Sequence, residues 1–220
     1  MAARKGGDDP HMNPGLDLVL QKARYYSLPR EVIDKALKKW SGKLEGHELQ
    51  EVMYEGYGPA GSALYIKCIT SNTNRATAEI RATMSRMGGT MAEPGAVSRQ
   101  FDQKGVIIIN GKAESKNEKW REVHSIIPYE KNQLEEDLLN LDIDDFDEQD
   151  GQCRVITSRE AFINVKKGLE ELHYNISDAD IQYLPQNEIT LADDAMATFE
   201  GLIEALEELE DVDSIYHNIG

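Results

Sequence analysis

The sequence has little of what builds a membrane span or a disulfide framework. No run approaches the roughly 18 apolar residues that a membrane helix requires. Only two cysteines occur in the 220 residues, Cys68 and Cys153, and they lack C-x-x-C spacing, which favours core thiols. The first residues also lack the charged, apolar and small-residue layout of a secretory signal. These absences predict a cytoplasmic protein without membrane association.

Motifs of known catalytic and cofactor sites are also missing. The chain has no HExxH, P-loop or G-x-S-x-G sequence, and its five histidines fall in different predicted elements. Gly56 to Gly61 does satisfy the dinucleotide fingerprint G-x-G-x-x-G. That fingerprint must follow a strand and open a helix, whereas here a strand follows it and Pro59 removes an N–H donor, so we interpret it as a turn. We predict a protein that is not an enzyme and has no cofactor.

An acidic run from Asp142 to Asp150 could suggest a calcium site. An EF-hand loop needs a glycine directly after its third ligand position and a distant glutamate, and this register fails here. The run is therefore interpreted as a solvated loop, and no metal site is expected.

Charge is strongly segregated along the chain. The formal net charge is −16, yet residues 1–45 carry nine Lys or Arg against six Asp or Glu. Residues 190–220 carry nine acidic residues and no Lys or Arg. Because phosphate binding depends on local positive charge, nucleic-acid contacts are expected in the first half. The acidic half either serves solubility or meets basic protein.

The basic candidates lie mostly in two predicted N-terminal helices. Asn13 and Pro14 open the first helix, with Leu16, Val19, Leu20 and Ala23 at helical spacing, and the second begins near Pro29. The alternative is that these cations form only the polar face of amphipathic helices. The candidate nucleic-acid-binding residues are Arg4, Lys5, Arg24, Lys35, Lys38, Lys39, Lys43, Arg75 and Arg81.

Periodicity predicts an α+β remainder. A strand at residues 63–70, a helix capped by Thr73 or Asn74 and strands at its flanks join a closing helix and strand at 193–209 and 214–218. Together they predict a β-α-β-β-α-β set, the ferredoxin-like arrangement. The intervening insertion has strands at 123–127, 152–157 and 179–184, a helix at 131–139, and a second helix capped by Thr157 and Glu160. Lys112 to Lys119 is polar and predicts a linker.

Several separated motifs resemble the YebC/PmpR family. They include Ala2-Ala3-Arg4-Lys5-Gly6-Gly7, Tyr54-Glu55-Gly56-Tyr57-Gly58-Pro59, Pro94-Gly95-Ala96-Val97 and Val212 to Asn218. The resemblance implies a small N-terminal helical domain and two α+β domains, one inserted in the other. We place these at 1–47, at 48–112 with 190–220, and at 113–189. Family members begin with a basic segment before the AARKGG-like motif, whereas Met1 directly precedes Ala2 here, so we expect a helical domain truncated at its start.

The loop from Gly88 to Val97 is long for a connection between a helix and a strand, and long ordered loops often carry function. We predict that Gly89, Met91, Pro94 and Gly95 contact a partner, with Met91 reaching into ribosomal RNA or a nascent peptide. The alternative is a tethered surface loop.

The resemblance implies a DNA-binding transcriptional regulator. It also implies a competing function, a ribosome-associated translation factor acting near the peptidyl-transferase region, as described for mitochondrial relatives that activate translation of cytochrome c oxidase subunit I. An acidic protein-binding adaptor is the third alternative. The expected partners are DNA or ribosomal RNA, with basic protein on the acidic half, and we expect a monomer.

Overall fold

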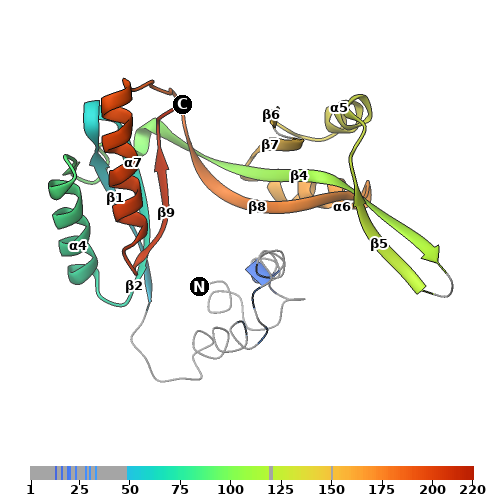
Figure 1. Ribbon diagram of the computed structural model, residues 1–220, viewed down its shortest axis with the longest axis horizontal. Coiled ribbons are helices and arrows are strands. Elements are labelled where there is room, and N and C mark those ends of the chain that lie inside the picture. The colour runs from blue at the N-terminus through green and yellow to red at the C-terminus, as the bar shows by residue number, and fades with distance from the viewer. Residues whose placement is uncertain are drawn as a thin grey trace. The chain divides into compact units, whose positions relative to one another are not determined.

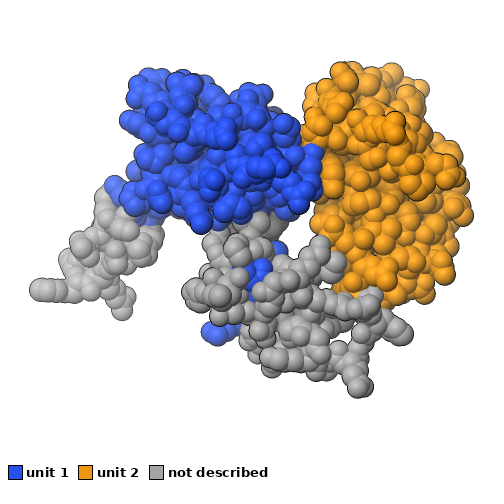
Figure 2. All heavy atoms as spheres, turned by 180° about the vertical axis from the view of Figure 1, so that it is seen from behind, with its two compact units in different colours: residues 1–45, 103–182 blue, residues 46–102, 183–220 orange. Residues whose placement is uncertain are grey.

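The computed structural model describes residues 49–118, 121–149 and 151–220, and the single positions Asn13, Leu16, Val19, Leu20, Ala23, Leu28, Arg30 and Ile33. The side chains of residues 115–124 are outside this description. Two compact units divide the chain, unit 1 with residues 1–45 and 103–182 and unit 2 with residues 46–102 and 183–220 (Figure 2). The α+β class predicted from the sequence is confirmed.

Part of the first predicted helix is visible at the described positions. Leu16, Val19, Leu20 and Ala23 are helical, as their spacing predicts. The side chain of Asn13 accepts a hydrogen bond from the amide of Leu16 at 3.2 Å, so Asn13 is the predicted cap. The remaining basic candidates of this region, Arg4, Lys5, Arg24, Lys35, Lys38, Lys39 and Lys43, lie outside the described residues.

Unit 2 is a four-stranded sheet with two helices on one face (Figure 1). Its elements are β1 (Gln50–Tyr57), the short turn η1 (Pro59–Gly61), β2 (Ala63–Thr70), α4 (Thr73–Arg86), β3 (Thr90–Met91), η2 (Ser98–Gln100), α7 (Asp193–Glu207) and β9 (Val212–His217). The strand order is β3-β1-β2-β9, and every neighbouring pair is antiparallel. The glycine motif forms the β1–β2 turn, as interpreted from its context.

The core of unit 2 joins both helices to the sheet. Ile80 and Met84 of α4 and Leu202 and Leu206 of α7 are buried against Ile66 of β2 and its neighbours. The order of elements differs from the β-α-β-β-α-β set that we predicted. β1 and β2 form a central hairpin, and the strand that we placed after the Gly88 to Val97 loop joins the other sheet, because its apolar residues pack in unit 1.

Unit 1 carries the split βαβ arrangement. Its elements are β4 (Phe101–Glu118), β5 (Arg121–Ile127), α5 (Lys131–Leu139), β6 (Asp145–Gln149), β7 (Gln152–Ser158), α6 (Phe162–Glu171) and β8 (Tyr174–Pro185). β4 lies between β7 and β8, and β6 lies beyond β7, while β5 forms a hairpin with the far end of β4. Leaving β5 aside, the element order β4-α5-β6-β7-α6-β8 is β-α-β-β-α-β.

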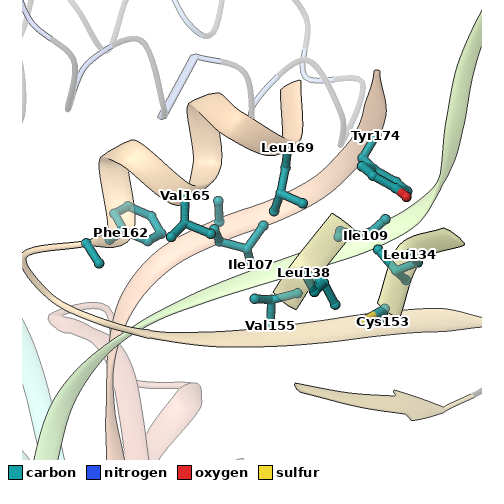
Figure 3. Packing of buried hydrophobic residues seen from close by; sticks show 12 residues of the cluster. Ile107, Ile109, Leu134, Leu138, Cys153, Val155, Phe162, Val165, Leu169 and Tyr174 are labelled. Carbon is teal, nitrogen blue, oxygen red and sulfur yellow. The ribbon is translucent and has the colours of Figure 1, made fainter. Parts of the chain in front are cut away.

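Both helices of unit 1 cover the same face of its sheet. Ile107 and Ile109 of β4 point toward Leu138 of α5 and toward Val165 and Leu169 of α6 (Figure 3). Cys153 is buried in this core and Cys68 in that of unit 2, and burial raises the pKa of each thiol to about 12. The interpretation of both cysteines as core thiols is confirmed.

Two polar segments that we predicted to be a linker and a loop are strands. Residues 112–118 are not a linker, because they extend β4 and pair with β5 from Lys112↔Ile127 to Glu118↔Arg121. Residues 145–149, which we interpreted as a solvated loop, form β6 and pair with β7. In both cases backbone hydrogen bonds make the strand, and they need no apolar side chain. β6 is an edge strand, and its acidic residues protect that edge from pairing with other chains.

Two helix caps and the domain boundaries also differ from expectation. Asn72, and not Thr73 or Asn74, caps α4 by accepting from the amide of Arg75 at 3.1 Å. The capping box of Thr157 and Glu160 does not form, and Ser158 Oγ instead accepts from the amide of Ala161. The units divide at 102/103 and 182/183, earlier at both ends than the predicted 112/113 and 189/190, because β4 and β8 belong to the insertion over most of their lengths.

Gly105 permits the close packing of α6 on the sheet and gives a stability test. A Cβ atom there would overlap Thr157 Oγ1 and lie 2.5 Å from Phe162 Cδ2. Gly105→Ala should therefore lower the free energy of unfolding by about 1–3 kcal/mol, measured by urea denaturation. In α7 a Cβ on Gly201 meets its nearest neighbour at 3.4 Å, so the control Gly201→Ala should be neutral or gain about 0.5–1 kcal/mol. Equal effects of the two substitutions would contradict this packing.

Candidate nucleic-acid interface

The outer face of α4 carries small side chains and arginines. Ala76, Ile80, Thr83 and Met84 are buried against the sheet, so the opposite side of the helix faces solvent. That side exposes Asn74, Ala78, Arg81, Ala82, Ser85 and Arg86. Because the alanine and serine side chains are short, they do not cover the longer arginine side chains next to them. We call these six residues the α4 outer face.

The charge of α4 sets it apart from the other described helices of eight or more residues. It carries three arginines and one acidic residue, Glu79. α5 carries one lysine and three acidic residues, α6 balances two of each, and α7 carries five acidic residues and no Lys or Arg. Local positive potential of this kind is what attracts a polyanion.

Arg81 and Arg86 are available for an outside ligand. Both are exposed, and within the part of the chain that the structure describes neither makes an ion pair. Arg81 was a candidate from the sequence. Arg86 was not among the candidates, although the apolar periodicity of the helix places it near solvent together with Arg75 and Arg81.

Arg75, the other α4 candidate, has a structural partner. Its guanidinium donates to both carboxylate oxygens of Asp211, with Nη2 at 2.8 Å from each and Nε at 3.2 Å from Oδ2. Asp211 is buried, and its backbone oxygen accepts from the amide of Ile69. The pair therefore joins the first turn of α4 to the segment before β9, and Arg75 is a weaker nucleic-acid candidate than Arg81.

The predicted partner loop is fixed to β1. Gly89 is buried, with Tyr57 O and Leu202 close to the position of an added Cβ, and Met91 pairs with Gly56 in the β1–β3 ladder. Met91 is half-buried and packs against the core of unit 2, and its contact with a partner stays a prediction. Pro94 and Gly95 are exposed, together with Glu93 and Ala96.

The side chain of Glu55 in β1 fixes this loop through hydrogen bonds to its backbone. Its carboxylate accepts hydrogen bonds from the amides of Gly95 at 2.8 Å, Val97 at 2.5 Å and Ser98 at 3.0 Å. Burial raises the pKa of the Glu55 carboxyl, but the hydrogen bonds from these three amides lower it further, and the pKa lies below its usual value. Glu55 lies in the motif of residues 54–59 that resembles the YebC/PmpR family, but its structural role was not predicted. Its partners are backbone groups, which no sequence pattern identifies.

Other kinds of site find little support in the described part of the chain. Among the described residues there is no group of three or more metal-ligating side chains, and none of the described helices is long and apolar enough to cross a membrane. A shallow depression in unit 1 is lined by Pro128, Tyr129, Lys131, Glu148, Gln149 and Gly151. Its charged groups are paired with each other, with Lys131 Nζ 2.5 Å from Glu148 Oε2.

Two family models match the chain. Residues 49–219 match the second and third domain of TACO1/YebC, and residues 1–43 match the N-terminal domain of the TACO1/YebC protein. The chain belongs to the TACO1/YebC family. The resemblance that we inferred from the separated motifs is therefore confirmed.

Relatives in this family share nearly the whole chain. A probable transcriptional regulatory protein of Caldanaerobacter subterraneus is 39% identical over 222 residues, which cover 99% of this chain and 84% of the relative. One of Geobacillus thermodenitrificans is 36% identical over 223 residues, covering 100% of this chain and 83% of the relative. The crystal structure of a conserved hypothetical protein from Aquifex aeolicus aligns with a TM-score of 0.85 at 31% identity, covering 100% of this chain and 85% of that one.

Arg75 and Arg81 should behave differently when each is replaced by glutamine. Arg75→Gln leaves the buried Asp211 carboxylate without its bidentate partner, so the thermal unfolding midpoint should fall. Arg81→Gln removes only an exposed side chain, and the midpoint should stay unchanged. Differential scanning calorimetry of both variants tests this assignment, and a stable Arg75 variant would show that the ion pair contributes nothing.

The Glu55 hydrogen bonds should make stability depend on pH. Because its pKa in the folded chain lies below the ordinary value of 4.5, its contribution to the free energy of unfolding is complete above that pH and is lost as the pH falls through the folded pKa. Urea denaturation of the wild type and of Glu55→Gln at a series of acidic pH values should give curves that converge as the pH falls. Parallel curves would contradict the assigned hydrogen bonds.

Proposed function

We propose that this protein is a regulator of gene expression that binds nucleic acid through the α4 outer face together with its basic N-terminal region. The observation that carries the proposal is the pair of exposed arginines, Arg81 and Arg86, which make no ion pair among the described residues. The names of the relatives describe regulatory proteins and support the same class of function.

The distribution of charge within unit 2 favours one orientation of a polyanion. α4 and α7 lie side by side on one face of the sheet (Figure 1). Arginines rise from α4, whereas α7 exposes carboxylates, among them Asp193, Glu200 and Glu204. A phosphate backbone is attracted by the first helix and repelled by the second, so it should run over α4 on the side away from α7.

The N-terminal region adds to the same interaction. Residues 1–45 carry nine Lys or Arg against six Asp or Glu, and residues 1–43 match the family's N-terminal domain. A basic region covalently joined to a second basic surface raises the effective concentration of each for one long polyanion. Both duplex DNA and ribosomal RNA offer such a ligand.

The type of nucleic acid separates the two functions that the family resemblance implies. A transcriptional regulator should prefer one promoter duplex over competitor DNA, measured by gel shift. A ribosome-associated translation factor should cosediment with ribosomes and show no operator preference. Both assays should be run with the full chain at the same salt concentration, because phosphate contacts weaken as salt rises.

Replacing both arginines tests the interface itself. Arg81→Gln with Arg86→Gln should weaken binding to every nucleic acid that the wild type binds. The slope of log K against log salt should become shallower by about 0.9 for each duplex phosphate contact that is lost, or about 0.7 on a single strand. Fluorescence anisotropy over a salt series measures both quantities.

The control for this variant makes the same charge change in unit 1. Arg159 and Lys167 are exposed there, and Arg159→Gln with Lys167→Gln should leave the salt slope at its wild-type value. If both double variants reduce affinity equally, overall charge and not the α4 outer face governs binding. An unchanged affinity in the α4 variant removes the proposed interface.

A further inference from the structure

The two helices of unit 2 expose opposite charges on one face of the sheet. Arg81 and Arg86 of α4 make no ion pair among the described residues, and neither do the exposed carboxylates of α7. We propose that this face binds a second copy of the chain, with α4 of each copy lying against α7 of the other. The exposed residues of α7, which we call the α7 outer face, are Asp193, Asp194, Ala197, Thr198, Glu200, Glu204 and Glu207.

α4 and α7 lie side by side and run in opposite directions (Figure 1). The last turn of α4 is level with the middle of α7, because Met87 Cε lies 3.4 Å from the position of a Cβ on Gly201. The first turn of α4 is level with the end of α7, since Arg75 bonds to Asp211 just after that helix. α4 therefore lies beside the second half of α7.

A two-fold axis parallel to the helices brings opposite charges together. If the axis runs between α4 and α7 along the outside of the helix pair, rotation places each helix over the other one of the second copy, at the same level. Arg86 then faces Glu200 and Glu204 of the second copy. Arg81 lies about 7.5 Å further down α4, and it faces Glu204 or Glu207. Each contact occurs twice, so the face is complementary to itself.

Small residues permit close contact between the two copies. With about 3.6 residues per turn, the middle line of the α4 outer face is formed by Ala78, Ala82 and Ser85. Arg81 and Arg86 lie on the two sides of this line. On α7, the exposed Ala197 and the half-buried Gly201 point outward in the same way. A helix of the second copy can therefore rest on small side chains between two guanidinium groups.

The size of this face predicts a weak pair. α4 has 14 residues and α7 has 15. At about 1.5 Å per residue and about 10 Å per helix diameter, the two helices cover about 20 Å by about 20 Å. A pair then buries roughly 800 Å² in total, whereas stable complexes bury about 1,200 Å² or more. The monomer expected from the sequence should prevail in dilute solution, and the pair should form as the concentration rises.

The net charge of −16 makes two copies repel each other at long range. At about 0.15 M salt, charges more than about 8 Å apart are largely screened, whereas charges in contact are screened less. Pairing should therefore be measured at physiological salt, where the contacts between arginines and carboxylates outweigh the repulsion of the remaining charges.

Pairing would regulate the proposed nucleic-acid site. In the pair, Arg81 and Arg86 lie against carboxylates of the second copy and are not available to phosphate groups. A polyanion and the second copy thus compete for the same guanidinium groups, and each weakens the binding of the other. This consequence rests on the proposed function, whereas the pairing itself does not.

Charge reversal and complementation test the pairing. Arg81→Glu with Arg86→Glu, and separately Glu200→Lys with Glu204→Lys, place like charges opposite each other in a pair. The sedimentation coefficient of the wild type should rise with concentration between micromolar and millimolar, and each variant alone should stay monomeric. An equimolar mixture of the two variants restores opposite charges at every contact and should associate at least as strongly as the wild type. A monomeric mixture, or a wild type that stays monomeric, would overturn the proposal.

Two further comparisons separate this contact from overall charge. Arg159→Glu with Lys167→Glu makes the same charge change at exposed positions of unit 1, and this variant should associate like the wild type. Ala82→Trp keeps the charge and places a large side chain on the middle line of α4, so it should stay monomeric. Its control, Ala113→Trp at an exposed position of unit 1, should still associate. Equal losses in variants of α4 and of unit 1 would exclude this face as the contact.

Addition of nucleic acid distinguishes the pairing from the proposed function. Energy transfer between donor-labelled and acceptor-labelled wild-type copies should fall when a single-stranded RNA or a DNA duplex is added. A wild type that pairs but binds neither ligand supports the pairing and removes the proposed function. A wild type that binds nucleic acid but never pairs removes the pairing alone. Binding without loss of energy transfer would overturn the competition between them.

Discussion

The seating of α4 on the sheet of unit 2 is the constraint on which the candidate interface depends. Ile80 and Met84 fix which side of the helix is buried, and the bond of Arg75 to Asp211 fixes its first turn against the segment before β9. One arginine is thereby used within the fold, while Arg81 and Arg86 are turned outward. Under the proposed function, binding and stability would use the same residue type along a single helix, separated only by the direction in which each side chain leaves it.

Apolar periodicity predicted the helices and the buried strands well. α5 has the predicted bounds of Lys131–Leu139, and β2 has those of Ala63–Thr70, because each alternates or repeats apolar residues that a core requires. β6 and the far half of β4 were missed because their side chains are polar and their partners are other strands. Backbone pairing of this kind depends on where the neighbouring strand lies, which local composition does not contain.

The candidate site was predicted only in outline for a related reason. Arg75 and Arg81 were candidates from the sequence, but Arg75 meets its partner 136 residues away and Glu55 meets Gly95 40 residues away. Contacts between residues so far apart in sequence decide which charged side chains are paired within the fold and which stay exposed. The family motifs gave the correct family because they record residues that the fold requires, whether or not the reason for each is visible in the sequence.

The inserted segment leaves unit 2 after residue 102 and returns to it at residue 183, and these two points lie close together. The amide of Gln186 donates to the oxygen of Gln100 at 2.8 Å, and Gln186 Nε2 donates to Asp102 Oδ1 at 3.0 Å. The two crossing points are thus neighbours on unit 2, and a tight turn could bridge them. Deleting the inserted segment, residues 103–182, and joining its two ends would therefore leave the fold of unit 2 unchanged. Insertions with neighbouring ends of this kind can be gained, exchanged or lost in evolution.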